Sequence, residues 1–151
     1  MSEIGFYHLV RSPLEKALPK LLEKVLESGA RAVVMAGSAE RVEALNALLW
    51  TYQPGSFLPH GSARDGASER QPIWLTDSDE NPNGASILVL TDGAASAQVE
   101  RYARCLEIFD GGDPEALERA RERWRAYRAA GHTVTYWQQT ETGGWEKKAA
   151  G

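Results

Sequence analysis

The chain has 151 residues, 42% of them hydrophobic and 25% charged, which is the composition of one globular domain with a sizeable core. Its formal net charge of −4 excludes nucleic-acid binding over the whole surface, although it leaves room for a local basic patch. We expect no secretory signal and no membrane span, and the lone Cys105 excludes an internal disulfide and suits the reducing cytoplasm.

Strands and helices are predicted to alternate along the chain. Apolar runs predict strands at residues 4–10, 31–36, 73–76, 86–90, 105–109 and 132–137. Helices are predicted from Ser12 to Gly29, from Ser38 to about Leu49, around 95–103 and from Asp113 to Gly131. This alternation predicts an α/β fold with a mainly parallel sheet and helices on both faces.

Capping signals mark the helix starts. Ser12, Pro13 and Glu15 have the spacing of an N-cap, a first-turn proline and the glutamate of a capping box. Ser38 opens the second helix, and Asp113 followed by proline opens the last one.

Three segments carry no helical or strand pattern. Residues 51–70 are irregular, and the polar stretch 77–85 is a turn between two strands. Residues 139–151 have no periodicity, so we expect one domain over 1–138 and a flexible tail over 139–151.

The sequence offers no specific signal for an enzyme or a metal site. None of the turns after the first strands has the glycine pattern of a phosphate loop, and Gly37 before Ser38 is at most a place for a small anion. A calcium loop beginning at Asp79 fails because its twelfth position is Leu90 rather than a glutamate. The three histidines lie far apart, and Cys105 opens an apolar strand, as a buried thiol does. We therefore expect no catalytic residues, no metal and no cofactor.

The helix at 115–130 sorts its side chains by type. Projection at about 100° per residue places an apolar arc, which contains Trp124, directly beside Arg121, Arg125 and Arg128. Arg119 projects elsewhere. One interpretation is a solvated helix stabilised by Glu–Arg pairs; another is a site for a ligand that is both anionic and apolar. A track for DNA phosphates is a third interpretation, although three arginines on an acidic chain make it weak.

Several motifs occur in an order that resembles a known family. They are FYHL at 6–9, LLW at 48–50, SFLPHG at 56–61, QPIWL at 71–75, EIFDG at 107–111 and ARERWRAYRAAGH at 120–132. Over residues 4–138 the chain resembles the chi subunit of the bacterial DNA polymerase III holoenzyme. It departs from the family pattern near its end, where Trp145 and two lysines follow Gly144.

The resemblance implies a Rossmann-like, three-layer α/β fold without nucleotide chemistry, and an accessory role in the clamp-loader complex. It implies two protein partners: the small psi subunit, as a heterodimer, and the acidic C-terminal tail of the single-stranded-DNA-binding protein, so that DNA is contacted only indirectly. Residues that match the family's tail-binding helix are Arg121, Trp124, Arg125 and Arg128. Residues that match the segment associated with the psi contact are Trp50, Phe57, Leu58, Pro59 and His60.

Two alternatives belong to other functional classes. A Rossmann-type enzyme for a small ligand or nucleotide would bind or hydrolyse nucleotide, although the missing phosphate loops count against it. A protein that binds single-stranded DNA directly would bind an oligonucleotide without a partner and with a steep salt dependence.

Overall fold

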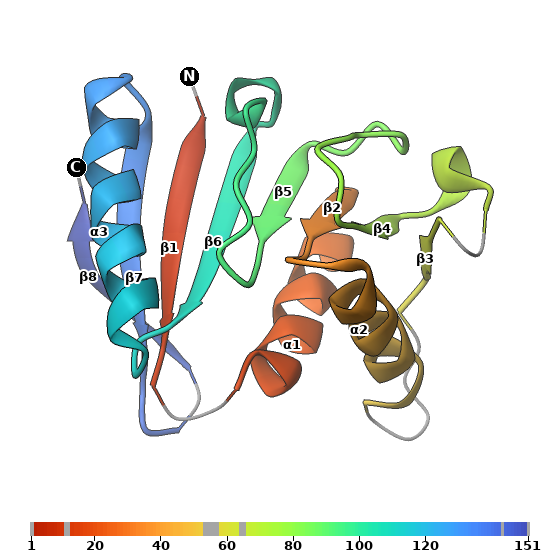
Figure 1. Ribbon diagram of the computed structural model, residues 1–151, viewed down its shortest axis with the longest axis horizontal. Helices are drawn as coiled ribbons and strands as arrows, with labels where there is room; N and C mark the ends of the chain where they lie inside the picture. Colours follow the sequence, from red (N-terminus) through yellow and green to blue (C-terminus); the bar gives the residue numbers. More distant parts are fainter. Residues whose placement is uncertain (1, 11–12, 53–57, 64–65, 143, 151) are drawn as a thin grey trace.

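A computed structural model of the chain describes residues 2–10, 13–52, 58–63, 66–142 and 144–150. Within these residues one eight-stranded, mostly parallel sheet is covered by three α-helices (Figure 1). The helices are α1 (Leu14–Glu27), α2 (Ala39–Thr51) and α3 (Pro114–Ala129). The strands are β1 (Glu3–Leu9), β2 (Ala32–Met35), β3 (His60–Ser62), β4 (Ile73–Thr76), β5 (Ile87–Leu90), β6 (Arg104–Asp110), β7 (Thr133–Gln139) and β8 (Trp145–Ala150).

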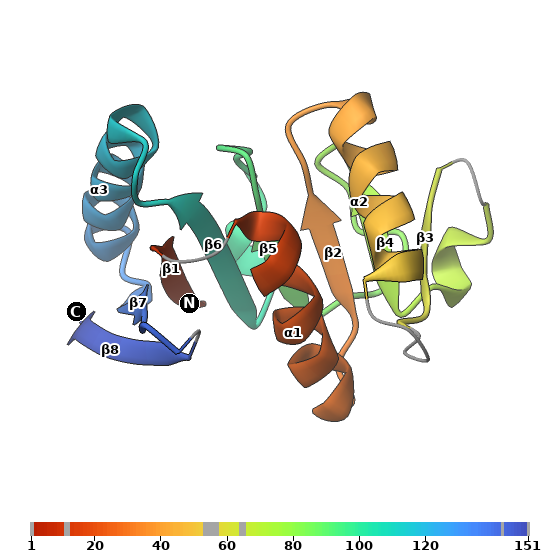
Figure 2. The ribbon, with the colours of Figure 1, turned by 90° about the horizontal axis from the view of Figure 1, so that it is seen from below.

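The strand order across the sheet is β3-β4-β2-β5-β6-β1-β7-β8 (Figure 2). Every neighbouring pair is parallel except β7 and β8, which run antiparallel. The N-terminal strand β1 lies inside the sheet, where Phe6 is opposite Glu107 of β6 and Tyr136 of β7. Near-continuous apolar runs suit such strands, because helices bury both of their faces.

Alternate residues of β1 belong to two separate cores. Tyr7 packs in the cluster that contains the buried faces of α1 and α2. Phe6 is fully buried in the other cluster, where the aromatic side chains of α3 pack against it. Because successive side chains of a strand point to opposite faces, α1 and α2 cover one face of the sheet and α3 the other. The expected α/β fold with a mainly parallel sheet is confirmed.

Two of the three predicted helix caps are confirmed. The Ser38 hydroxyl accepts a hydrogen bond from the Arg41 amide, and the Asp113 carboxylate accepts one from the Glu115 amide. The first helix begins at Leu14 with Pro13 at the N-cap position, one residue later than predicted, and Ser12 lies outside the described residues.

Three sequence-based expectations are corrected. Within the segment expected to be irregular, residues 60–62 form β3, held by parallel pairing with β4. The helix expected around 95–103 is only a 3₁₀ turn over Val99–Arg101. The tail expected to lack regular structure contains β8, which extends the sheet by pairing with β7. Both unpredicted strands lie at sheet edges, where backbone pairing with one neighbour suffices to form a strand.

Candidate functional site

The two sides of α3 have different roles. Its apolar side packs on the sheet: Ala120 is buried, and the rings of Trp124 (edge-on) and Tyr127 (tilted) pack against Phe6, with centroids 5.5 and 6.0 Å away. The arginines beside this face, Arg121 and Arg125, are exposed. The arrangement that the helical projection predicted is therefore present, with basic side chains bordering an aromatic edge.

A groove of about 360 Å³ lies between α3 and the strands beneath it. Three residues matched to the tail-binding helix, Arg121, Trp124 and Arg125, line it together with Ala120 of α3, Tyr136 of β7 and Ala149 of β8. The rings of Trp124 and Tyr136 meet edge to face, with centroids 6.1 Å apart. The groove thus has an apolar floor and two guanidinium groups at its rim.

Two polar side chains of the groove, those of Tyr136 and Arg121, interact with residues that do not line it. The Tyr136 hydroxyl hydrogen-bonds Nδ1 of His8, which fixes the Tyr136 ring as part of the floor. Burial raises the pKa of Tyr136 and nearby Arg121 lowers it, with burial the larger effect, so the phenol stays a neutral donor or acceptor. Arg121 lies 4.0 Å from Glu118 one turn earlier, an exposed pair that exchanges easily with another carboxylate. Arg128 is exposed on the same helix but does not line the groove.

The residues matched to the psi contact lie at the other end of the sheet, around α2 and β3. Trp50 is 52% exposed, unusual for a tryptophan, and its ring lies 5.0 Å from that of His60. Leu58 and His60 are buried, and the His60 ring nitrogens face the carbonyl oxygens of Leu58 and Asn46. Pro59 is partly exposed and Phe57 lies outside the described residues. Trp50 is thus the exposed side chain, and Leu58 and His60 support it.

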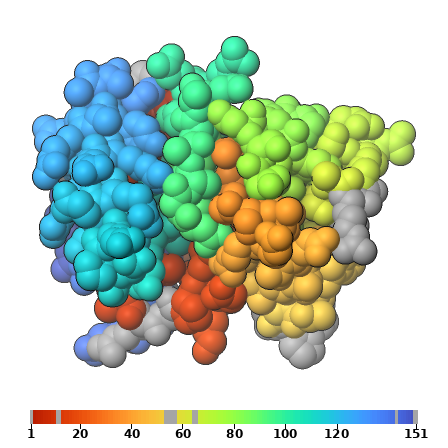
Figure 3. Space-filling view, viewed as in Figure 1, coloured from red at the N-terminus to blue at the C-terminus, as the bar shows by residue number. Residues whose placement is uncertain are grey.

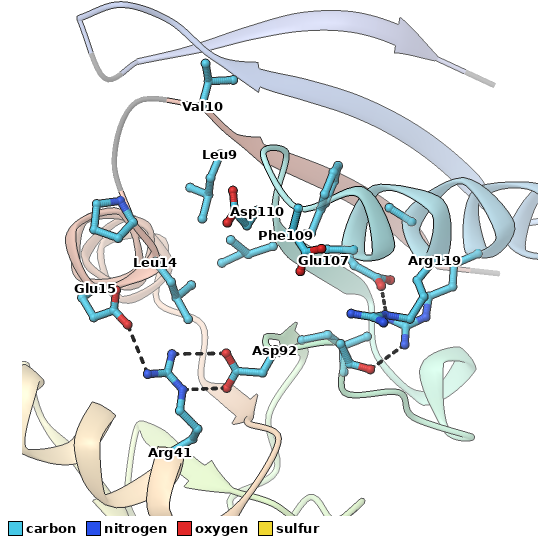
Figure 4. Close-up of a pocket in the computed structure, with 18 residues that line it drawn as sticks. Leu9, Val10, Leu14, Glu15, Arg41, Asp92, Glu107, Phe109, Asp110 and Arg119 are labelled. Atoms are coloured by element: carbon cyan, nitrogen blue, oxygen red, sulfur yellow. Dashed lines mark hydrogen bonds and ion pairs between the residues drawn. The ribbon is translucent and has the colours of Figure 1, made fainter.

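A larger crevice, about 570 Å³, opens where β1, β5 and β6 end (Figure 4). In α/β sheets ligands commonly bind beyond the carboxyl ends of the strands, so this is where a nucleotide would be sought. An ion-pair network lines one side of it: Arg41 forks onto both oxygens of Asp92, at 3.0 and 3.2 Å, and also reaches Glu15 at 3.1 Å.

The same carboxylate occupies the position where a phosphate would bind. Asp92 also accepts a hydrogen bond from the amide of Gly37, at the N-terminus of α2. Sequence analysis named Gly37 as a place for a small anion, and the Asp92 carboxylate of the chain itself takes that place. The lining carries five carboxylates, from Glu15, Asp92, Glu107, Asp110 and Asp113, and three guanidinium groups, from Arg41, Arg119 and Arg123, so its net charge is negative and disfavours a polyphosphate. The crevice therefore opposes nucleotide binding.

Comparison with known proteins decides the family. A family model described as "DNA polymerase III chi subunit, HolC" matches residues 1–135. The chain is 38% identical over 107 residues to the "Probable DNA polymerase III subunit chi" of Rickettsia prowazekii (strain Madrid E), which covers 69% of this chain and 65% of that protein. It is 25% identical over 138 residues to the "DNA polymerase III subunit chi" of Pseudomonas aeruginosa PAO1, which covers 89% of this chain and 94% of that protein.

The chain belongs to the DNA polymerase III chi subunit family. The motifs from FYHL to the basic helix fall inside the matched span, and β8 falls outside it. The chain spans just under two thirds of the Rickettsia relative that it matches, at 65%.

In this chi-family chain, the side chains of Cys105 and Asp79 that sequence analysis tested for chemistry are buried or hydrogen-bonded within the fold. Burial, with nearby Glu107 as the smaller contribution, raises the pKa of the Cys105 thiol to about 12, so at neutral pH it carries no thiolate. Asp79, the first residue of the rejected calcium loop, accepts hydrogen bonds from the Ser96 hydroxyl and the Ala97 amide. In the described residues no group of three or more potential metal ligands gathers. None of the helices in the described ranges has the length and apolar character needed to cross a membrane.

Sequence reasoning missed three residues that matter here. Tyr136 and Ala149 line the groove from β7 and β8, and no local pattern connects them to α3. The third is Glu107, a buried carboxylate in β6 that pairs with Arg123 of α3. Its signal was visible, because a charged residue in the middle of the apolar run 105–109 needs a partner when it is buried.

Proposed function

We propose that the chain is a non-enzymatic accessory subunit of the DNA polymerase III clamp-loader complex in the cytoplasm, and that it links the loader to the single-stranded-DNA-binding protein. In this proposal the groove beside α3 holds the acidic C-terminal tail of that protein, the surface around Trp50 holds psi, and DNA is reached only through the partners. The sheet order and the two covered faces support a Rossmann-like, three-layer arrangement that serves as a scaffold for these surfaces.

The groove carries the proposal, because its chemistry matches such a tail. A tail of aspartates that ends in an apolar residue and a free carboxylate needs cations beside an apolar floor. Arg121 and Arg125 supply the cations, and guanidinium groups can fork onto carboxylates. Trp124 and Tyr136 supply the floor. Arg128, exposed further along α3, extends the positive surface beyond the groove.

The psi contact is supported by the Trp50 surface. An exposed tryptophan held against a buried histidine is typical of the aromatic anchors in protein interfaces. Pro59, which precedes His60 in the chain, is partly exposed, whereas Leu58 and His60 are buried. We propose that Trp50, Pro59 and Phe57 make the contact, with Leu58 and His60 as its support.

Titration calorimetry with a peptide that copies the acidic tail tests the leading function. We expect modest affinity, with a Kd on the order of micromolar, or about −8 kcal/mol. Reversing the charge at one rim position, Arg125→Glu, should cost roughly 2 kcal/mol, because a contact is lost and the tail is repelled. The affinity should also fall as salt is added, because the rim arginines are exposed.

The matched control is Arg119→Glu, the same reversal on the same helix. Arg119 lies in the crevice on the other side of α3, near Glu115 and Gly93, and does not line the groove. It should change the affinity by less than about threefold. Equal losses for the two reversals, or binding without salt dependence, would reduce the basic side of α3 to a solvated helix face. Binding of a bare oligonucleotide with a steep salt slope would favour direct DNA contact instead.

A further inference from the structure

Strand β8 lies outside the span that the family model matches, yet it forms one wall of the groove. The match ends at residue 135, and β8 begins at Trp145. Ala149 of β8 is opposite Tyr136 in the antiparallel pair. Opposite residues in such a pair project from the same face, so Ala149 faces the groove beside Tyr136. It is one of the six residues that line the groove.

A β-bulge decides which side chain reaches the groove. The register passes from Tyr136 opposite Ala149 to Trp137 opposite Lys147, so Lys148 is the extra residue between the two pairs. Without the bulge, the regular ladder would place Lys148 opposite Tyr136 and turn Ala149 to the other face. The bulge therefore puts the smallest available side chain against the floor and keeps the groove open.

The two lysines of β8 lie on different faces. Lys147 is opposite Trp137, whose ring stacks on Tyr7 in the core on the far side of the sheet. Lys148 adjoins Ala149, and its ammonium lies 3.5 Å from Glu146, which is opposite Gln138 on the groove side. This lysine–glutamate pair is exposed, and such pairs are weak and exchange readily with another carboxylate.

Resting on the proposed function, we propose that β8 is the second wall of the acidic-peptide site. Ala149 leaves the space that the peptide's apolar C-terminal side chain fills, and Lys148, next to Ala149 but outside the lining of the groove, supplies a third cation on the β8 side. Lys148, which pairs with Glu146, turns to a carboxylate of the peptide when the peptide binds. Specificity for a short acidic peptide with an apolar end thus depends on a strand that the family model does not cover.

Calorimetric titration of the full chain with an acidic peptide ending in an apolar residue and a free carboxylate tests this. Lys148→Glu should weaken binding about tenfold, because it replaces a cation next to Ala149 by an anion. Its neighbour offers the matched control: Lys147→Glu makes the same change of charge on the opposite face and should weaken binding by less than about threefold. Equal effects of the two reversals would overturn the role of Lys148.

Two substitutions of Ala149 test the wall itself. Ala149→Leu fills the groove and should weaken binding at least about tenfold, whereas Ala149→Gly leaves the space open and should stay within about twofold of the wild type. Replacing the apolar last residue of the peptide by glycine should weaken binding to the wild type and have little further effect on Ala149→Leu. Additive losses would mean that Ala149 does not face that residue, even if Ala149→Leu disturbs the strand.

The reference variant Arg125→Glu separates the two proposals. If the wild type does not bind the peptide, or Arg125→Glu does not weaken binding, the proposed function fails. If Arg125→Glu weakens binding while Lys148→Glu and Ala149→Leu do not, only the role of β8 fails. Circular dichroism and the thermal midpoint of each variant show that the fold is retained.

Discussion

The contact between Glu107 and Arg123 anchors α3 to the sheet. The Glu107 side chain is 4% exposed in the middle of β6, and Arg123 reaches it from α3 and also donates to the carbonyl of Gly93. Burial raises the pKa of Glu107, and Arg123 counteracts part of that rise. The buried carboxylate therefore depends on the guanidinium for its charge to be tolerated.

Arg123→Ala should lower the free energy of unfolding by about 3 kcal/mol at pH 7, because it leaves a buried carboxylate without its cation. The loss should shrink as the pH falls toward the ordinary carboxyl value of about 4.5. A raised pKa in the folded state contributes stability at low pH that is lost as pH rises, and removing Arg123 raises the pKa further. Urea unfolding at several pH values measures this.

Two variants control for the loss of an arginine. Arg119→Ala removes an exposed side chain whose nearest carboxylate, on Glu115, is 4.0 Å away, and it should cost less than about 0.5 kcal/mol. Adding Glu107→Gln to Arg123→Ala should abolish the pH dependence. A loss for Arg123→Ala that is the same at pH 5 and pH 7 would contradict the argument.

At the scale of the elements, the N-cap of α2 is Ser38, as the sequence predicts. Ser38→Ala should destabilise the protein by about 1 kcal/mol, because the Arg41 amide loses the hydroxyl that caps it. Ser38→Asn keeps an acceptor at that position and should recover most of the loss. Thermal unfolding of the three proteins measures the difference, and an equal loss for both variants would mean that the cap contributes nothing.

How much the sequence could predict depends on how local the signal was. Strands with apolar runs and helices with caps were found within a few residues, since both signals lie inside the element. The edge strand β3 has the sequence His-Gly-Ser and no apolar pattern, and the bulge in β8 interrupts any alternation. Pairing with a neighbour makes both of them strands, and pairing is not written in the local sequence.

The residues of the candidate site could likewise be predicted only where they lie close together in the sequence. The helical projection placed Arg121, Trp124 and Arg125 together because they share one helix. Tyr136 and Ala149 could not be added, since their contact with α3 depends on strand order and register. The segment at 95–103 shows the opposite failure: its alanines favour a helix, but the Asp79 carboxylate holds the Ser96 hydroxyl and the Ala97 amide and fixes a turn instead.

At the scale of the whole molecule, the two proposed interfaces lie far apart. The Trp50 surface adjoins β3 and the groove adjoins β8, and these are the two edge strands. In the space-filling view the C-terminal part of the chain (blue) and the region of α2 (yellow) lie on opposite sides of the molecule (Figure 3). Seven spacings of about 4.8 Å separate the edges by roughly 34 Å, several times the Debye length of about 8 Å in physiological salt. The two sites should therefore be electrostatically independent.

Psi and the acidic peptide should bind at the same time. The peptide's Kd should agree within about twofold whether or not psi is bound, because no charge at one edge is felt at the other. Trp50→Ala should weaken psi binding and leave peptide binding unchanged, and Arg125→Glu should do the reverse. Calorimetry on the preformed heterodimer measures both, and a variant that weakens both partners equally would show that the sites are coupled.

The interior position of β1 has a consequence for synthesis on the ribosome. The first strand made pairs with β6 and β7, and its partner in β6 is about 100 residues away in the sequence. At about 5–20 residues per second, β1 emerges roughly 5–20 s before β6 has been synthesised. Throughout that interval the apolar segment from Ile4 to Leu9 has neither of its neighbours, and β2, β4 and β5 can pair among themselves first. The half of the sheet that carries the groove therefore assembles last, after β6 and β7 have been made.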